Sequence, residues 1–292
     1  MRCLNFSRCV FLIVMMVLSA TGCNTTKMMV DSMDPLMGKM NDAVNKHTDI
    51  EMVRDAMPAA LIQLDGLIEA SPDNVGLLVR AAEGYNGYSF IFVEGTDNKR
   101  AMRLYNRAFG YASRALKQNR QVAAAFDGPV DAFEESLQSL GKKDVPALFW
   151  AATSWLSWAG LNVDDPEIFL ALPKIRRMLN RCVELDETYR YGIAHAVLGV
   201  LNASRSVAQG GKPEQAKAEF DRAFELSDGK MLVFKLTYAQ YYAYQIQDRE
   251  LYVRTLTEIV EAPDDLFPQM GFINASAKKK AAAYLKNVDS IF

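Results

Sequence analysis

Two helical patterns meet within residues 192–232, which read GIAHAVLGVLNASRSVAQGGKPEQAKAEFDRAFELSDGKML. The first pattern places Leu198 beside Gly199, and the second spaces Ala216, Phe220 and Ala223 along one helix face. Small residues at such positions let two antiparallel helices approach closely, while an aromatic ring fills the gap beside them. The stretch therefore predicts a helical hairpin that buries its apolar face by stacking against a neighbouring hairpin.

Degenerate copies of this pattern recur along the chain. They are Ala82 and Tyr85 followed by Ala101, Tyr105 and Ala108, and then Ala239 with Tyr242. The prolines lie mostly between long helix-like segments, and alternating strand-like runs are not apparent, so we expect an all-α fold. Residues 51–292 are predicted to form a TPR-like solenoid of helical hairpins with about four degenerate repeats. The alternative is a generic alanine-rich helical bundle.

The first residues carry the features of an export signal. Arg2 and Arg8 precede or flank an apolar run from Cys9 to Ala20, and no acidic residue occurs among them. A membrane-spanning helix needs about 20 apolar residues, so this run suits a signal peptide better than an anchor. Small residues then lead into Cys23, as in a lipobox. We expect residues 1–22 to be a lipoprotein signal peptide and Cys23 to be lipidated; the alternative is an ordinary N-terminal anchor.

Residues 23–50 are polar and rich in Met, and we expect them to form a flexible tether with room for a short helix. The protein would then be lipid-anchored in the cell envelope and face the periplasm. Asn24, in place of an Asp, favours an outer membrane where the host has one. Loss of the two leader arginines leaves 31 basic against 35 acidic residues, and this acidic balance argues against nucleic-acid binding.

The chain offers few residues for catalysis. His47 and His195 are its two histidines, so a His-rich metal site or a His-based dyad has few candidates. We interpret His195 as a satisfied core or interface residue and Cys182 as core packing. The run Lys278-Lys279-Lys280 is interpreted as a solvated helix face. We therefore predict that the protein is not an enzyme and has no metal or cofactor.

Residues 51–117 resemble the TatT family of TPR-type lipoproteins, which are associated with tripartite ATP-independent periplasmic (TRAP) transporters. The matching segments are DAMPAALIQLDGLIEASPDN, GYSFIFVEG and AMRLYNRAFGYASRAL, and later the stretch from residue 192 and APDDLFPQMGFINASAKKKAAAYL. They follow the order of the family across nearly all of residues 51–292.

This resemblance implies a membrane-tethered periplasmic component that assembles as a homotrimer. It further implies a partner, the TRAP substrate-binding protein, and a pore or tunnel within each protomer. The sequence leaves two functions open. One is a transport accessory that helps to pass a small apolar or amphipathic organic ligand, and the other is a TPR scaffold that grips a protein partner in the cell envelope.

Three aromatic-rich helices are candidates for the wall of such a cavity. Aromatic rings at helical spacing more often belong to a core, so core packing is the alternative role at each position. We nevertheless expect the ligand cavity to be lined by Tyr85, Tyr88, Phe92, Trp155, Trp158 and Tyr242.

Overall fold

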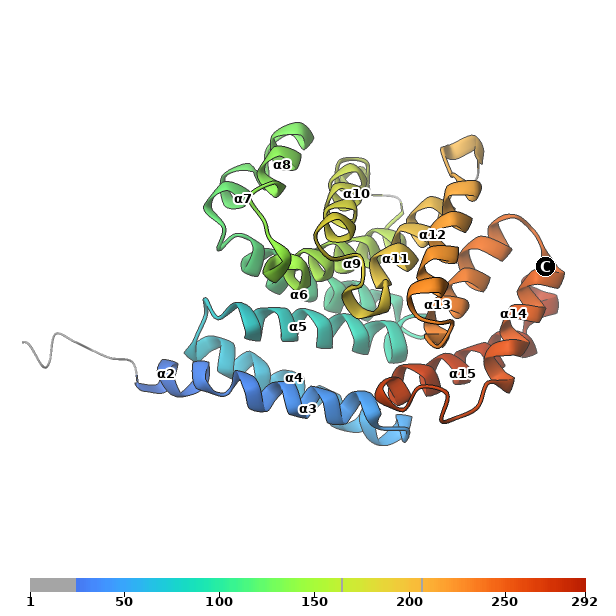
Figure 1. The fold of residues 1–292 in the computed structure, drawn as a ribbon, viewed down its shortest axis with the longest axis horizontal. Helices are drawn as coiled ribbons and strands as arrows, with labels where there is room; N and C mark the ends of the chain where they lie inside the picture. Colours follow the sequence, from blue (N-terminus) through green and yellow to red (C-terminus); the bar gives the residue numbers. More distant parts are fainter. Residues whose placement is uncertain (1–24, 164, 206) are drawn as a thin grey trace, which may run out of the picture.

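The computed structural model describes residues 25–163, 165–205 and 207–292, and within these ranges it contains helices and turns but no β-strand (Figure 1). The prediction of an all-α protein is confirmed. The α-helices are α2 (Thr25–Ser32), α3 (Asp34–Lys46), α4 (Ile50–Ala70), α5 (Val75–Tyr88), α6 (Asn98–Leu116), α7 (Arg120–Ala125), α8 (Val130–Leu137), α9 (Val145–Leu161), α10 (Glu167–Asp186), α11 (Ile193–Ala203), α12 (Pro213–Leu226), α13 (Leu232–Thr237), α14 (Arg249–Glu261) and α15 (Gly271–Lys286). Two π-helical segments, η1 (Ser89–Val93) and η5 (Tyr238–Ala243), continue α5 and α13 directly.

Short polar side chains fix where several helices begin. Asp49, Asn74 and Asp97 each precede a helix, and each accepts a hydrogen bond from a backbone N–H of its first turn. These caps satisfy donors that have no partner within the helix. The helix starts therefore follow from local sequence.

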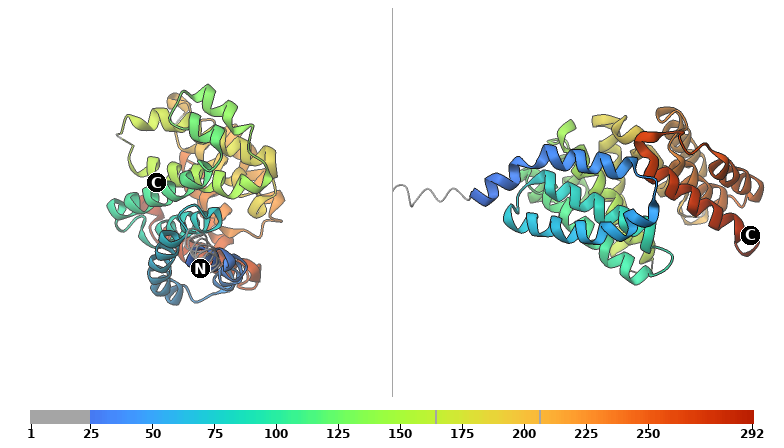
Figure 2. Two further views of the ribbon diagram at one scale, coloured as in Figure 1. Left: turned by 90° about the vertical axis from the view of Figure 1, so that its left-hand side faces the viewer. Right: turned by 90° about the horizontal axis from the view of Figure 1, so that it is seen from below.

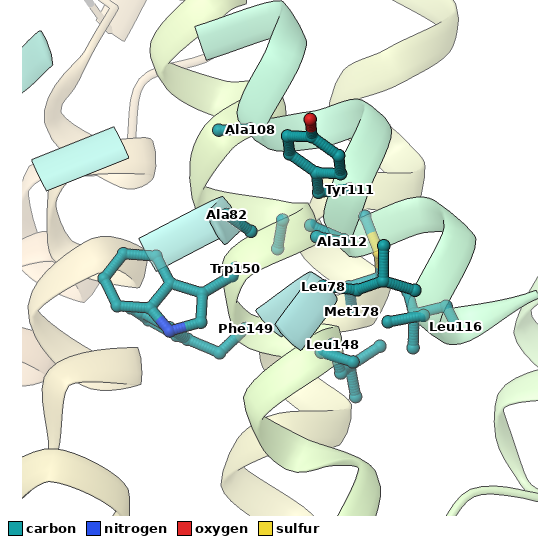
Figure 3. Packing of buried hydrophobic residues seen from close by; sticks show 14 of the residues in the cluster. Leu78, Ala82, Ala108, Tyr111, Ala112, Leu116, Leu148, Phe149, Trp150 and Met178 are labelled. Atoms are coloured by element: carbon teal, nitrogen blue, oxygen red, sulfur yellow. The ribbon is translucent and has the colours of Figure 1, made fainter. Parts of the chain in front are cut away.

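Small residues bring α5, α6 and α9 together at the centre of the molecule. Ala82 on α5 and Ala108 and Ala112 on α6 are fully buried, so the helices approach closely, and large side chains such as Phe149 fill the space around them (Figure 3). The same cluster extends to α10, where Cys182 is completely buried and burial raises the pKa of its thiol. The interpretation of Cys182 as core packing is confirmed.

The hairpin predicted from residues 192–232 is formed by α11 and α12. Ala216, Phe220 and Ala223 are fully buried on α12, against α11. A Cβ atom added to Gly199 would lie 2.7 Å from the Phe220 ring, so a glycine at this position allows the close approach of the two helices.

Helices from the two ends of the chain meet. α15 packs on α3 and α4 as well as on α13 and α14, and the views in Figure 2 place the end of α3 beside α15. A Cβ atom added to Gly271, the first residue of α15, would lie 3.1 Å from the carbonyl oxygen of Lys46. The described chain therefore curves until α15 rests against α3 and α4.

The segment expected to be a flexible tether is helical in its described part, as α2 and α3. Asp31 accepts hydrogen bonds from Ser71 (2.6 Å) and Asn74 (2.6 Å), and these bonds lower the pKa of its carboxyl to about 2. Asp34 pairs with Arg80 at 3.0 Å. The polar residues that suggested a tether thus hold these helices against α5 and against the turn between α4 and α5.

Replacing Gly199 by Ala should destabilise the protein by about 1–3 kcal/mol, because the new methyl group overlaps the Phe220 ring. Gly110, inside α6, is the matched control: a Cβ there meets no atom within 4 Å. Gly110→Ala should be neutral or stabilising by up to about 1 kcal/mol through helix propensity. Chemical denaturation measures both. An equal effect of the two substitutions would contradict the close contact.

Candidate functional site

The six aromatic residues predicted to line a cavity do not form one wall. Tyr85 and Tyr88 are buried in the central core, and the Tyr85 hydroxyl donates to Asp65 at 2.6 Å. Phe92 is half-buried, and its ring lies 5.5 Å from that of Tyr88 and 6.2 Å from that of Phe272 on α15. The structure therefore brings Tyr88 and Phe92 together and turns the polar end of Tyr85 toward α4.

The remaining three candidates lie in other surroundings. Trp155 is half-buried and stacks on Phe109 of α6 at 4.8 Å, and Trp158 is half-buried against the central core. Tyr242 stacks on Tyr238 at 4.9 Å in a separate cluster and borders a pocket of 170 Å³ between α11, α12 and the end of η5. Typical ligand pockets span about 300–1,000 Å³, so this pocket suits only a small fragment.

The two π-helical segments mark a different place. In η1 the N–H of Glu94 donates to Ser89 O, one residue further back than in an α-helix, and the N–H of Gly95 donates to Asn98 Oδ1. The carbonyl oxygen of Phe90 therefore accepts a hydrogen bond from neither of these two N–H groups. It accepts instead a hydrogen bond from Lys280 Nζ of α15. Such π-helical turns occur frequently at functional sites because they release backbone groups and re-aim side chains.

Around this contact lies a set of polar residues from four elements, which we call the interior cluster: Glu94, Tyr105, Gln240, Tyr241, Lys280 and Tyr284. The Tyr105 hydroxyl donates to Glu94 Oε2, and Gln240 Nε2 in η5 donates to the Tyr284 hydroxyl at 2.6 Å. The Oε1 atom of Gln240 is buried and has no hydrogen-bond partner among the described residues. A buried polar atom without a partner is uncommon and provides an acceptor for a ligand.

The interior cluster combines strong desolvation with partial exposure. Burial lowers the pKa of Lys280 and raises the pKa of Tyr241, yet both side chains keep part of their surface accessible. A side chain on a convex surface stays hydrated and its pKa changes little. The interior cluster is therefore a set of desolvated but partly exposed polar groups that lies between η5, α6, α15 and the turn after η1.

This placement corrects the interpretation of the lysine run. Lys279 is exposed and pairs with Glu51, and Lys278 donates to Ala262 O and Asp264, so these two belong to the surface. Lys280 instead points inward, with its Nζ 4.5 Å from the centre of the Phe90 ring. Of three consecutive lysines, one thus points inward, and the sequence alone does not show which one.

A second inward cation is held by unusual backbone. Arg190, Tyr191 and Gly192 have successive φ values of 46°, 63° and 83°. The left-handed region is unfavourable for the first two residues and costs about 1–3 kcal/mol for each. The turn directs Arg190 to Glu83 of α5, with nitrogen and oxygen 2.7 Å apart, and over the ring of Trp150.

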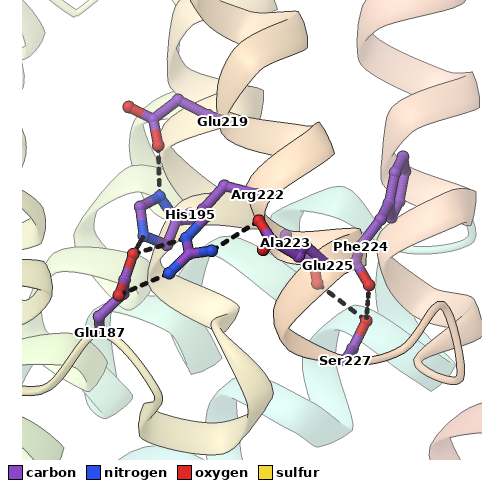
Figure 4. A network of polar contacts seen from close by, with 8 residues as sticks. All are labelled: Glu187, His195, Glu219, Arg222, Ala223, Phe224, Glu225 and Ser227. Atoms are coloured by element: carbon purple, nitrogen blue, oxygen red, sulfur yellow. Dashed lines mark hydrogen bonds and ion pairs between the residues drawn. The ribbon is translucent and has the colours of Figure 1, made fainter.

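A polar network fixes the base of this turn (Figure 4). Arg222 of α12 binds both carboxylate oxygens of Glu187, at 2.7 and 2.9 Å. His195 Nδ1 lies 2.6 Å from Glu219 and its Nε2 lies 3.3 Å from Glu187. His195 is buried, which confirms its interpretation as a core or interface residue. Its Nδ1 is hydrogen-bonded to Glu219, whereas its Nε2 has no hydrogen-bond partner among the described residues, so only one ring nitrogen is satisfied.

The structure thus positions cations, carboxylates and rings at two places, the interior cluster and the turn before α11, and comparison with known proteins gives them a context. The model of the family TAtT, described as the TRAP transporter T-component, matches residues 46–292. The chain belongs to this family. An uncharacterized protein of Treponema pallidum (strain Nichols) is similar to it, with 21% identity over 263 residues that cover 84% of this chain and 80% of the relative.

Membership assigns the chain to transporter components and not to an enzyme family. In the described ranges of this T-component, no group of three or more His, Cys, Asp or Glu residues could hold a metal ion. No described helix is long and apolar enough to cross a membrane. Cys23 lies outside the described residues.

The buried position of Lys280 has a measurable effect on stability. Because burial lowers its pKa below the usual 10.5, the unfolded chain binds this proton more tightly, and stability should rise as pH increases toward 10.5. Lys280→Met should remove that rise and leave the Tm at pH 7 within about 2 °C, since relief of desolvation offsets the lost hydrogen bond. Thermal unfolding from pH 7 to 10 tests this. Lys279→Met is the control and should keep the wild-type pH dependence; loss of the rise in both variants would exclude a special environment for Lys280.

Proposed function

We propose that the protein is a periplasm-facing lipoprotein accessory of a TRAP transporter. It is anchored through lipid on Cys23, assembles as a homotrimer, and docks the TRAP substrate-binding protein. Its body is a TPR-like solenoid, in keeping with the α11–α12 hairpin and its close contact at Gly199. Its task is to help pass a small organic ligand, apolar or amphipathic, between the substrate-binding protein and the membrane components.

The observation that carries this proposal is the interior cluster. It places a desolvated cation, Lys280, against the carbonyl and the ring of Phe90. One turn further along α15, Tyr284 is bonded to Gln240, whose buried Oε1 has no hydrogen-bond partner among the described residues. Small-molecule sites usually combine an apolar lining with a few convergent polar groups. An amphipathic ligand could place its polar end at Lys280 and its apolar part on the rings of Phe92 and Phe272.

The partner subunit and the ligand can be tested together. In a host strain that lacks this gene, wild type, Lys280→Met and Lys279→Met are compared for TRAP-dependent uptake and for binding of the purified substrate-binding protein. We expect Lys280→Met to lower uptake about tenfold, the loss of one charge-assisted hydrogen bond, while partner binding is unchanged. Lys279→Met should behave as wild type.

Two outcomes would overturn the proposal. If none of the proteins binds the substrate-binding subunit, the assignment of the partner is wrong. If all bind it and Lys280→Met supports full uptake, the protein acts as a scaffold and the interior cluster is not a ligand site.

Lipid attachment has its own test. Because Cys23 follows a short apolar run and three small residues, we expect radiolabelled palmitate to enter the wild-type protein and not the Cys23→Ser variant. The Cys182→Ser variant is the control, since Cys182 is buried and should not affect labelling. Equal labelling of wild type and Cys23→Ser would contradict the anchor.

A further inference from the structure

The first two helices of the described chain, α2 and α3, carry an apolar stripe that is largely exposed. Its members are spaced by three or four residues, so they follow one face across α2 and α3. Met29 and Met40 are each 61% exposed and Leu36 is 57% exposed. The apolar stripe consists of Met29, Met33, Leu36, Met40 and Val44.

The orientation of this stripe is fixed by the adjacent face of the same helices, which packs on the body. Val30 is buried and Met37 packs against the central core. Asp31 is bound by Ser71 and Asn74, and Asp34 is bound by Arg80. The helices therefore cannot rotate to bury the stripe, and two acidic residues that would repel an anionic surface are engaged with the body.

The position in the chain indicates what covers the stripe. α2 begins at Thr25, two residues after Cys23 and five after the apolar run that ends at Ala20. Two extended residues span about 7 Å. Whether the chain is held by lipid on Cys23 or by the apolar run itself, the start of α2 is kept at the membrane surface. A helix with an exposed apolar face at that position lies in the interface, with the face among the acyl chains.

We propose that the apolar stripe lies on the lipid bilayer and that α2–α3 runs along the membrane surface. The 22 residues from Thr25 to Lys46 reach about 33 Å as helix, so the contact is long enough to set the orientation of the whole body. A lipid chain alone leaves a protein free to rotate relative to the membrane, whereas this contact holds the body in one orientation. The proposal rests on the anchoring proposed above.

The test uses the mature lipidated protein in vesicles of phosphatidylethanolamine and phosphatidylglycerol. An environment-sensitive fluorophore is attached at Met40→Cys in one sample and at Asp42→Cys in the other. Asp42 is exposed and lies two residues away, on the opposite side of the helix. Cys182 is buried and should not react. Spin-labelled lipids quench a fluorophore within the bilayer, and iodide quenches one in water.

We expect quenching by spin-labelled lipids to be several-fold stronger at position 40 than at position 42, with the reverse order for iodide. In a Leu36→Gln protein the lipid quenching at position 40 should fall. Equal quenching at both positions in vesicle-bound protein would overturn the membrane contact and leave the lipid anchor intact. Disulfide cross-linking between copies at position 40, without lipid quenching, would assign the stripe to a second copy and overturn the proposal. Failure of the protein to remain on vesicles would refute the anchor itself.

Discussion

The contact between Lys280 and the carbonyl of Phe90 joins the last helix of the chain to its first half, and the proposed site depends on it. The contact needs a carbonyl that is not bonded within its helix, which the π-helical turn of η1 provides. It also needs a lysine that is partly desolvated. It also needs α15 to reach η1, which is possible because small residues let the intervening helices stack closely and curve. The apolar packing of these helices thus brings the polar groups of the interior cluster together.

The arrangement contains several features that oppose stability. Two non-glycine residues of the turn before α11 have left-handed backbone, Lys280 is desolvated, and Gln240 Oε1 has no partner in the described chain. Each such feature persists only where the surrounding structure imposes it, and such features gather at functional sites. Two of them, Lys280 and Gln240, belong to the interior cluster, and they support the proposed site more strongly than the aromatic rings do, because rings such as Tyr85 also serve the core.

Much of the fold could be predicted from the sequence, because the signals are local. The hairpin at residues 192–232 follows from the spacing of Gly199, Ala216, Phe220 and Ala223, and these residues meet as expected. The candidate site could not be predicted in the same way. A π-helical turn has no recognisable spacing, and the inward direction of Lys280 depends on contacts between segments 190 residues apart. For residues 25–46 the sequence suggested a tether with room for a short helix, and it did not show how far the helices extend, because the contacts of Asp31 and Asp34 with Ser71, Asn74 and Arg80 join segments about 40 residues or more apart.

The central claim is that the interior cluster receives a ligand, and photoaffinity mapping tests it most directly. A long-chain carboxylate with a diazirine on its chain is bound to the protein and irradiated, and the modified residues are found by mass spectrometry. The account predicts insertion at residues around the cluster, such as Phe90, Phe92 and Tyr241, and its loss in Lys280→Met. Insertion confined to the outer surface, or unchanged by Lys280→Met, would contradict it.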